Sequence, residues 1–218
     1  MHHDSPSAVR TRRHLLQGAA VLGGAALLGA PARAALLPTA RQGMGPFYPD
    51  RLPLDTDNDL VRIAGHDQGA LGDIAHVFGT VRDTAGRALT GAQVEIWQCD
   101  ARGRYIHSAD ARRGGSDDAF QGYGRTLTDT DGAYRFRTIR PVPYPGRAPH
   151  IHVLVTTPDG RRLVTQMYVA GAPENARDRL LNGVRDPAQR AALIVEFAPA
   201  PQLEASALGG RFDIVLAA

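Results

Sequence analysis

The segment "HIHVLVTTPDGRRLVTQMYV" (His150 to Val169) predicts the fold more directly than any other part of the chain. Its two halves, His150–Thr157 and Arg162–Val169, have the apolar content and partial period-two alternation of half-buried β-strands. The residues "TPDGR" between them carry the Asp-Gly chemistry of tight turns. The segment therefore predicts two strands joined by a short turn.

Short runs of the same character recur along the chain, separated by "DTAGR", "TDTDGA" and "TPDGR". Only "ENARDRLLNGVRD" and "DPAQRAAL" have a helical pattern, and both are short. The regular spacing of turns and the lack of long helices predict an all-β fold, an antiparallel β-sandwich. The further predicted strands are His76–Asp83, Gln93–Asp100, Ala133–Ile139, Ala192–Pro199 and Arg211–Ala217.

The residues before the first predicted strand lack the strand pattern. The stretch "GPFYPDRLPLDTDND" has a density of Pro and Asp that disfavours regular elements. We expect an irregular N-terminal arm over residues 35–75, laid over a single β-sandwich domain at residues 76–218. No internal repeat is visible.

Residues 1–34 have the features of a targeting segment. Arg12 and Arg13 in "TRRHLLQ" resemble a twin-arginine export signal, and the apolar stretch Leu15–Ala30 ends shortly before "ARA". This stretch is short and rich in Gly and Ala for a membrane-spanning helix. We expect an exported, periplasmic or extracellular protein with no stable membrane anchoring after cleavage; an uncleaved N-terminal anchor is the alternative.

The charge of the chain bears on nucleic-acid binding, and its cysteine content bears on disulfide formation. The chain has 25 basic residues, all arginine, and 22 acidic residues; residues 1–34 hold four of the arginines and one aspartate, which leaves 21 of each. A near-neutral mature domain gives no support to a nucleic-acid partner. Cys99 is the only cysteine, so no intrachain disulfide can form.

His150 and His152 are the first candidate functional residues. Side chains at positions i and i+2 of a strand point to the same face, so the two imidazoles can lie side by side. Neutral imidazole is a versatile metal ligand, and the pair makes half of a plausible metal site. A His-x-His pair also occurs in strands by chance, so the pair alone does not establish a metal site.

Tyr144 strengthens the metal hypothesis. Pro143 and Pro145 fix the backbone on either side of it, so the phenol comes from a loop with few alternative conformations. A phenol keeps its proton to a pKa near 10, so a tyrosine ligand needs a hard, highly charged cation such as ferric iron. The alternative is an aromatic residue that packs at a turn.

Three segments resemble the intradiol ring-cleavage dioxygenases, particularly the protocatechuate 3,4-dioxygenase branch. They are "GAQVEIWQCDARGRYIH" (91–107), "FQGYGRTLTDTDGAYRFRTIRPVPYPGRAPHIHVLV" (120–155) and "QMYV" (166–169). The resemblance implies a non-haem Fe(III) held by two tyrosines and two histidines. Its motifs place these ligands at Tyr105, Tyr144, His150 and His152.

The resemblance also implies the reaction. A catecholic substrate and O2 would be converted to a muconate-type dicarboxylic acid by cleavage between the two hydroxylated ring carbons. Tyr144 would leave the metal and take a substrate proton, and Arg147 would stabilise electron density on the attacked carbon. Gln166 would assist Arg147 by hydrogen bonding. A surface salt bridge for Arg147 and a solvent-facing side chain for Gln166 are the alternatives.

One departure from the family concerns the pocket. Only five residues separate Tyr144 from His150, fewer than in the familiar enzymes, which predicts a more open site and leaves the accepted catechol undecided. Oligomeric state and the need for a second subunit are also open. The rival functions are a secreted, non-catalytic β-sandwich binding module or inactive subunit, and a zinc or copper hydrolase built on the histidines.

Overall fold

The computed structural model describes residues 34–53, 55–110 and 115–217. Residues 1–33 of the predicted leader lie outside these ranges, so the twin-arginine-like signal stays a prediction. No helix within the described ranges has the length and apolar character needed to cross a membrane.

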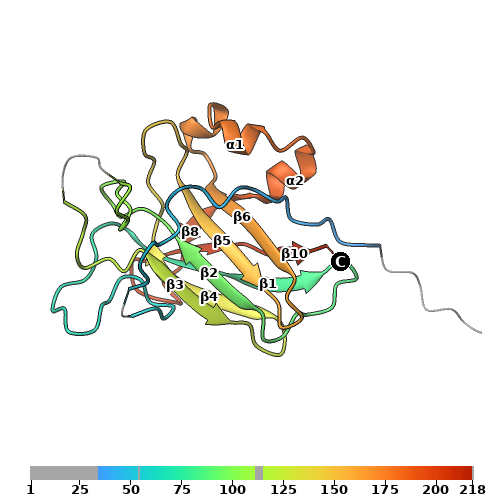
Figure 1. Ribbon diagram of the computed structural model, residues 1–218, viewed down its shortest axis with the longest axis horizontal. Helices are drawn as coiled ribbons and strands as arrows, with labels where there is room; N and C mark the ends of the chain where they lie inside the picture. Colours follow the sequence, from blue (N-terminus) through green and yellow to red (C-terminus); the bar gives the residue numbers. More distant parts are fainter. Residues whose placement is uncertain (1–33, 54, 111–114, 218) are drawn as a thin grey trace, which may run out of the picture. The chain divides into compact units, whose positions relative to one another are not determined.

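The described residues form two five-stranded sheets that face each other, which confirms the predicted all-β sandwich (Figure 1). The first sheet contains β1 (Ile74–Asp83), β4 (Ala133–Ile139), β8 (Phe197–Pro199), β9 (Leu208–Arg211) and β10 (Ile214–Leu216). The second sheet has the order β3-β2-β5-β6-β7, with β2 (Gln93–Trp97), β3 (Tyr123–Leu127), β5 (His150–Thr156), β6 (Arg162–Val169) and β7 (Ile194–Val195).

The predicted hairpin lies in the second sheet. Strands β5 and β6 pair antiparallel, with His152 opposite Gln166 and His150 opposite Tyr168. The turn between them closes through a hydrogen bond from Gly160 N to Thr157 O at 2.9 Å, and Gly160 adopts a φ of +86°. A left-handed backbone conformation at this position explains why the turn sequence carries glycine.

The strand pairs β1–β4, β2–β3, β2–β5, β5–β6 and β8–β9 are antiparallel as predicted. Three pairings that involve the short C-terminal strands are parallel instead: β1–β10, β1–β9 and β6–β7. Sequence periodicity does not encode strand direction, so this feature was not expected. Strand β3 was also missed, since Gly124 and the exposed Arg125 interrupt its apolar pattern.

Two predicted strands are divided in the structure. The run 192–199 supplies the end of α2 and then β7 and β8, which belong to different sheets. The run 211–217 is broken at Phe212 and Asp213, where the Asp213 carboxylate accepts a hydrogen bond from Thr80 N at 2.9 Å. Because a side chain satisfies this strand donor, the backbone ladder is interrupted between β9 and β10.

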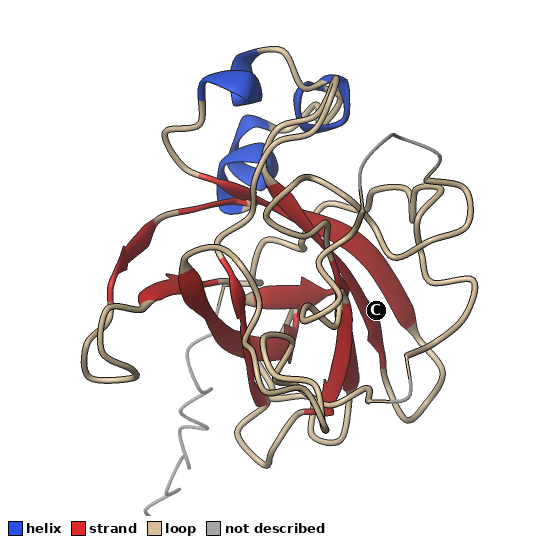
Figure 2. Cartoon of the chain, turned by 90° about the vertical axis from the view of Figure 1, so that its left-hand side faces the viewer, coloured by secondary structure: helices blue, strands red, loops and turns tan. Residues whose placement is uncertain are grey.

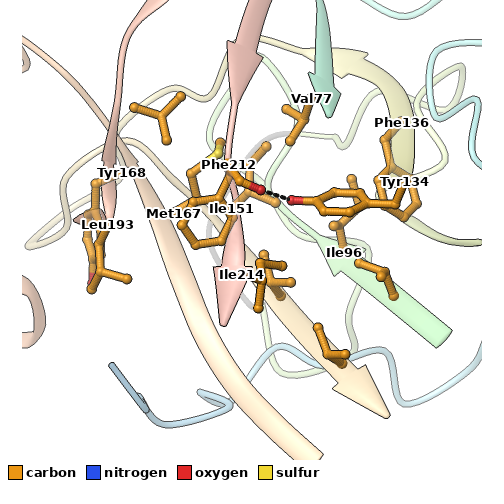
Figure 3. Close-up of a cluster of buried hydrophobic side chains, with 14 of the residues drawn as sticks. Val77, Ile96, Tyr134, Phe136, Ile151, Met167, Tyr168, Leu193, Phe212 and Ile214 are labelled. Carbon is orange, nitrogen blue, oxygen red and sulfur yellow. Dashed lines mark hydrogen bonds between the residues drawn. The ribbon is translucent and has the colours of Figure 1, made fainter. Parts of the chain in front are cut away.

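The main core fills the space between the two sheets. Figure 3 shows aromatic and aliphatic side chains from both sheets in contact, including Ile96, Ile151 and Phe136. The one polar atom of the Tyr134 side chain is also satisfied, because its hydroxyl donates a hydrogen bond to Phe212 O at 2.6 Å. Burial of such side chains is the dominant stabilising term, about 1.5–3 kcal/mol for each large apolar residue.

The irregular arm is confirmed and forms an integral part of the fold. Its described residues before β1 contain no helix or strand, and Leu60 and Val61 are buried in the main core. Backbone hydrogen bonds tie Thr39 N to Val215 O at 3.0 Å and Gln42 N to Val164 O at 2.9 Å. Figure 1 shows the arm, in blue, crossing in front of the second sheet.

The helices are short, as predicted, and gather at one end of the sheets (Figure 2). They are the 3-10 helix η1 (Pro173–Ala176), α1 (Arg179–Asn182) and α2 (Pro187–Ala192). Asp178 and Asp186 cap α1 and α2, each accepting two backbone N–H bonds. Such caps stabilise helices that are too short to persist alone.

Candidate metal centre and active site

The candidate site lies on the outer face of the second sheet, under the arm. On β5, Ile151 and Val153 point into the main core, so His150 and His152 point to the opposite face. The ring of His152 stacks on Trp97 of β2, with centroids 4.8 Å apart and planes 7° apart. Strand alternation thus places both imidazoles together, as the sequence predicted.

The two histidines are prepared to act as ligands. His150 Nδ1 lies 2.6 Å from Ala148 O; because a carbonyl can only accept, this nitrogen carries the hydrogen and Nε2 keeps its lone pair. The Nε2 atoms of His150 and His152 are 3.2 Å apart. Burial lowers the pKa of His150 to about 4 and that of His152 well below its usual range. Both rings are therefore neutral near pH 7.

Tyr105 lies next to the histidine pair. Its loop is shaped by two aspartates: Asp110 accepts from Tyr105 N at 2.9 Å, and Asp100 accepts from Arg104 N at 2.9 Å. The Tyr105 ring centroid is 6.1 Å from that of His152 and 5.7 Å from that of Tyr144. Four rings from three separate segments therefore converge.

The Tyr105 hydroxyl is the clearest sign that this cluster suits a cation. It is buried and forms no hydrogen bond of good geometry among the described residues, although it lies close enough to the Tyr144 hydroxyl for the two groups to influence each other. Burial raises the pKa of Tyr105 well above its ordinary value, so the protein alone holds it as a neutral phenol. An unsatisfied buried hydroxyl costs about 1–3 kcal/mol. A metal ligated by the phenolate oxygen would remove that cost.

Tyr144 sits at the boundary between the buried cluster and a cavity. A tight turn holds it: Arg147 N donates to Tyr144 O at 2.9 Å, and Gly146 has a φ of +81°. Burial raises the pKa of Tyr144, and the nearby charge of Arg147 opposes this shift. Its ring centroid is 5.4 Å from that of His150. Of the four candidate ligands, Tyr144 is the one that lines the cavity of about 460 Å³ beside Arg147.

Arg147 is fixed by several partners rather than free in solvent. Its Nε donates to Asp178 Oδ2 at 2.8 Å, and its side chain is 15% exposed. Its terminal nitrogens reach Gln166 Oε1, Tyr168 Oη at 3.3 Å and Tyr144 Oη at 3.4 Å. Burial works against the charge, yet the hydrogen bond to Asp178 keeps the pKa of Arg147 above its ordinary value. The predicted alternative of a surface salt bridge does not describe this arrangement.

Gln166 is fully buried, so the alternative of a solvent-facing side chain is wrong. Its Oε1 accepts from Arg147 and from Tyr168 Oη, the latter at 3.1 Å, and its Nε2 donates to Gly43 O at 3.3 Å. Gln166 therefore links Arg147 to the arm. The hydrogen bond to Arg147 is the contact that the resemblance implied, and the assisting role in catalysis stays a prediction.

Sequence reasoning missed Asp178, the buried partner of Arg147. Burial would raise its pKa, but bonds from Leu181 N, Ala148 N and Arg147 hold the pKa below its usual value. The signal was available, because Asp178 immediately precedes the helical pattern "RLLN" and such a residue caps a helix. The pairing of Asp178 with Arg147 becomes visible only in the structure, because 31 positions separate the two residues.

The arm completes the site, which sequence reasoning left undefined. Phe47 stacks on Tyr105, with centroids 4.7 Å apart. Tyr48 anchors the arm by donating to the buried Glu95 at 2.7 Å, and Tyr123 donates to the same carboxylate at 2.9 Å. An aromatic cover excludes water and so strengthens electrostatic interactions within the cluster.

A cavity of about 460 Å³ opens beside Tyr144 and Arg147. Its size falls within the range of small-molecule sites. No group of three or more His, Cys, Asp or Glu side chains in the described part of the chain is arranged to hold a metal, so the candidate donor set depends on the tyrosines. The cavity is lined by Pro143, Tyr144, Pro145, Gly146, Arg147, Glu174, Arg177 and Asp178.

Known proteins are similar to this chain in sequence and in fold. The family model described as "Dioxygenase" matches residues 44–218. The chain is 42% identical over 168 residues to the protocatechuate 3,4-dioxygenase beta chain of Burkholderia cepacia, covering 73% of this chain and 71% of that one. It is 37% identical over 203 residues to the hydroxyquinol 1,2-dioxygenase of Corynebacterium glutamicum, covering 79% of this chain and 62% of the relative.

A solved structure agrees with these relatives. The dioxygenase domain of a dioxygenase and carbohydrate-binding protein fusion from Streptomyces sp. SirexAA-E superposes with a TM-score of 0.64 at 32% identity. The match covers 83% of this chain and 98% of that domain. The chain belongs to the intradiol ring-cleavage dioxygenase family.

Proposed function

We propose that the protein is a non-haem Fe(III)-dependent intradiol dioxygenase. It cleaves a catecholic ring between the two hydroxylated carbons, using O2, and yields a muconate-type dicarboxylic acid. The observation that carries this proposal is the convergence of Tyr105, Tyr144, His150 and His152 beside the fixed Arg147.

The donor set fits a ferric ion. Tyr105 and Tyr144 would supply two anionic oxygens, and His150 and His152 two neutral nitrogens, which suits a hard trivalent cation better than zinc or copper. A ferric ion held by these residues would act as a Lewis acid toward a catechol and would make its ring reactive toward O2.

The protein's own residues divide the remaining work. Tyr144 borders the cavity, which supports a role for its phenolate oxygen as the acceptor of a proton from a substrate hydroxyl. Arg147 carries a permanent charge 3.4 Å from that oxygen and would stabilise negative charge that develops on the ring. Gln166 and Asp178 hold the guanidinium, so little reorganisation is needed as that charge forms.

The decisive experiment combines colour and isotope labelling. Iron-loaded protein should be red-brown through phenolate-to-iron charge transfer, and catechol added without O2 should shift the visible band. With 18O2, both labelled atoms should appear in the dicarboxylic product. A colourless protein with stoichiometric iron, or a product that carries one label, would contradict the proposal.

We also propose that the chain is exported, on the strength of the "TRRHLLQ" sequence and the apolar stretch that follows it. Changing Arg12 and Arg13 together to Lys should trap the protein inside the cell. Fractionation followed by immunoblotting measures this, and an unchanged distribution would contradict a twin-arginine route.

A further inference from the structure

A second cavity, of about 700 Å³, lies outside the candidate metal centre. The arm, the start of β6, the α1–α2 region and the last strand all contribute to it. None of the candidate metal ligands lines it. We call it the arginine groove, and its charged lining residues are Arg41, Arg161, Arg162, Arg179 and Arg185.

The charge of the arginine groove is one-sided. Its lining includes five arginines and no acidic residue. Arg161 pairs with Asp159 at 2.9 Å, but within the described ranges no carboxylate forms an ion pair with Arg162, Arg179 or Arg185. The mature sequence has equal numbers of basic and acidic residues, so this concentration is local. A cleft lined by one sign of charge attracts ions of the opposite sign.

The floor of the arginine groove is apolar. Leu163, Val184 and Leu216 line it and are buried, while Leu180 is 45% exposed at its side. Arginines around an apolar floor match a ligand with a hydrocarbon body and an anionic end. A volume of about 700 Å³ is in the range of small-molecule sites, about 300–1,000 Å³.

The groove has rigid walls on the side of the arm. Arg41 donates to Arg162 O, Gln42 Nε2 donates to Leu180 O at 3.0 Å, and Gln189 Nε2 donates to Pro38 O at 2.8 Å. These bonds join segments more than 100 positions apart. The shape of the groove is therefore set by the fold and does not depend on a ligand to assemble it.

We propose that the arginine groove binds a small amphipathic carboxylate, at a site separate from the candidate metal centre. The carboxylate pairs with Arg162 and Arg179, because guanidinium groups match carboxylates in geometry as well as charge. The hydrocarbon body covers the apolar floor beside Leu180.

The test uses 4-phenylbutyrate as the probe and calorimetric titration of the whole protein. We expect one binding site whose affinity falls as salt is added, since screening weakens exposed charge pairs. The neutral isostere 4-phenylbutan-1-ol should bind at least about tenfold more weakly. Absence of binding, or equal affinity for the alcohol, would overturn the proposal.

Variants locate the site. The double change Arg162→Gln and Arg179→Gln should weaken binding at least about tenfold. The matched control, Arg62→Gln with Arg125→Gln, removes the same charge from exposed positions outside the groove and should leave affinity unchanged. The single changes Arg162→Gln and Arg179→Gln give separate results if the double variant folds poorly, and each should weaken binding. Equal affinity in the groove and control variants would show that the anion binds elsewhere and would refute the assignment.

Discussion

At the scale of single residues, the site combines groups that the protein alone cannot satisfy. The buried Tyr105 hydroxyl and the buried Nδ1 of His152 form no hydrogen bond among the described residues. Leaving buried polar atoms unpaired costs free energy in the metal-free chain. Ligation of a cation by the Tyr105 oxygen would remove the cost at that atom.

Tyr105→Phe separates the two roles of this residue. In the iron-loaded protein it should bleach much of the visible band and lower turnover at least about 100-fold, a loss of roughly 3 kcal/mol in transition-state stabilisation. In the metal-free protein the free energy of unfolding should stay the same or rise slightly, because an unpaired hydroxyl is removed. Denaturant unfolding of the metal-free variant measures the second effect, and a loss above about 2 kcal/mol would mean that the hydroxyl has a stabilising partner.

Asp178→Asn tests whether Arg147 is held in place by its buried partner. We expect retained iron and colour but a turnover lowered by about tenfold or more, because a weakened Asp178 contact lets the guanidinium move. Asp186→Asn is the matched control, since Asp186 caps α2 in the same manner. Equal effects of the two changes on turnover would assign Asp178 a role in the helix alone.

The candidate ligands, Arg147 and Gln166 could be named from the sequence because the family resemblance rests on the short motifs that carry them; their roles stay predictions. Asp178, Trp97 and Glu95 could not be named in this way. Their roles arise from contacts between segments that are distant along the chain, and no local pattern encodes such contacts. The orphaned Tyr105 hydroxyl is likewise a property of packing.

At the scale of elements, the sequence predicted the long strands well and the short ones poorly. Strands β4 and β6 have the predicted bounds, since each is a half-buried run with clear turn residues beside it. The run 192–199 failed because it passes from one sheet to the other, which leaves the apolar pattern unbroken. The alternation of apolar residues indicates which side chains are buried. It does not indicate which of the two sheets a strand joins.

Gly79 in β1 marks a close approach between two backbones. A Cβ built at this position would lie 2.0 Å from Phe212 O. Gly79→Ala should therefore destabilise the fold by about 1–3 kcal/mol or more, since the backbone would have to shift. Chemical denaturation measures this, with Gly115→Ala as a control because nothing lies within 4 Å of a Cβ there. Equal stability of the two variants would contradict the close approach.

At the scale of the whole described fold, one charged network joins distant parts of the chain. Arg137 on β4 binds Glu204 at 2.7 Å and Asp59 of the arm at 3.1 Å. His76 on β1 lies 3.1 Å from the same Glu204 carboxylate. The network therefore connects the arm, the first sheet and the C-terminal segment.

This network predicts a loss of stability in acid. The hydrogen bond from Arg137 lowers the pKa of Glu204 to about 2. A carboxyl whose pKa is lower in the folded state contributes stability above its unfolded pKa, near 4.3, and loses it as pH falls toward 2. Since Glu204 is partly exposed, we expect a contribution of about 1 kcal/mol after solvent screening.

Glu204→Gln should flatten the fall of the unfolding free energy between about pH 4.3 and 2. Denaturant unfolding at a series of pH values measures the slope. Glu196→Gln is the control, because Glu196 is exposed and forms no ion pair within the described ranges. If the unfolding free energies of the two variants fell with the same slope, Glu204 would not contribute to the loss of stability in acid.

The lone thiol of the chain has a practical consequence. Cys99 is 1% exposed and packs in the same cluster as Trp97 and Tyr105, beneath the arm. A thiol-specific dye can reach it only when the packing around this cluster opens or the molecule unfolds, so the labelling rate reports how often the cover of the candidate site opens. The protein thus contains a natural reporter of local opening at its candidate active site, and no engineered label is needed to time that motion.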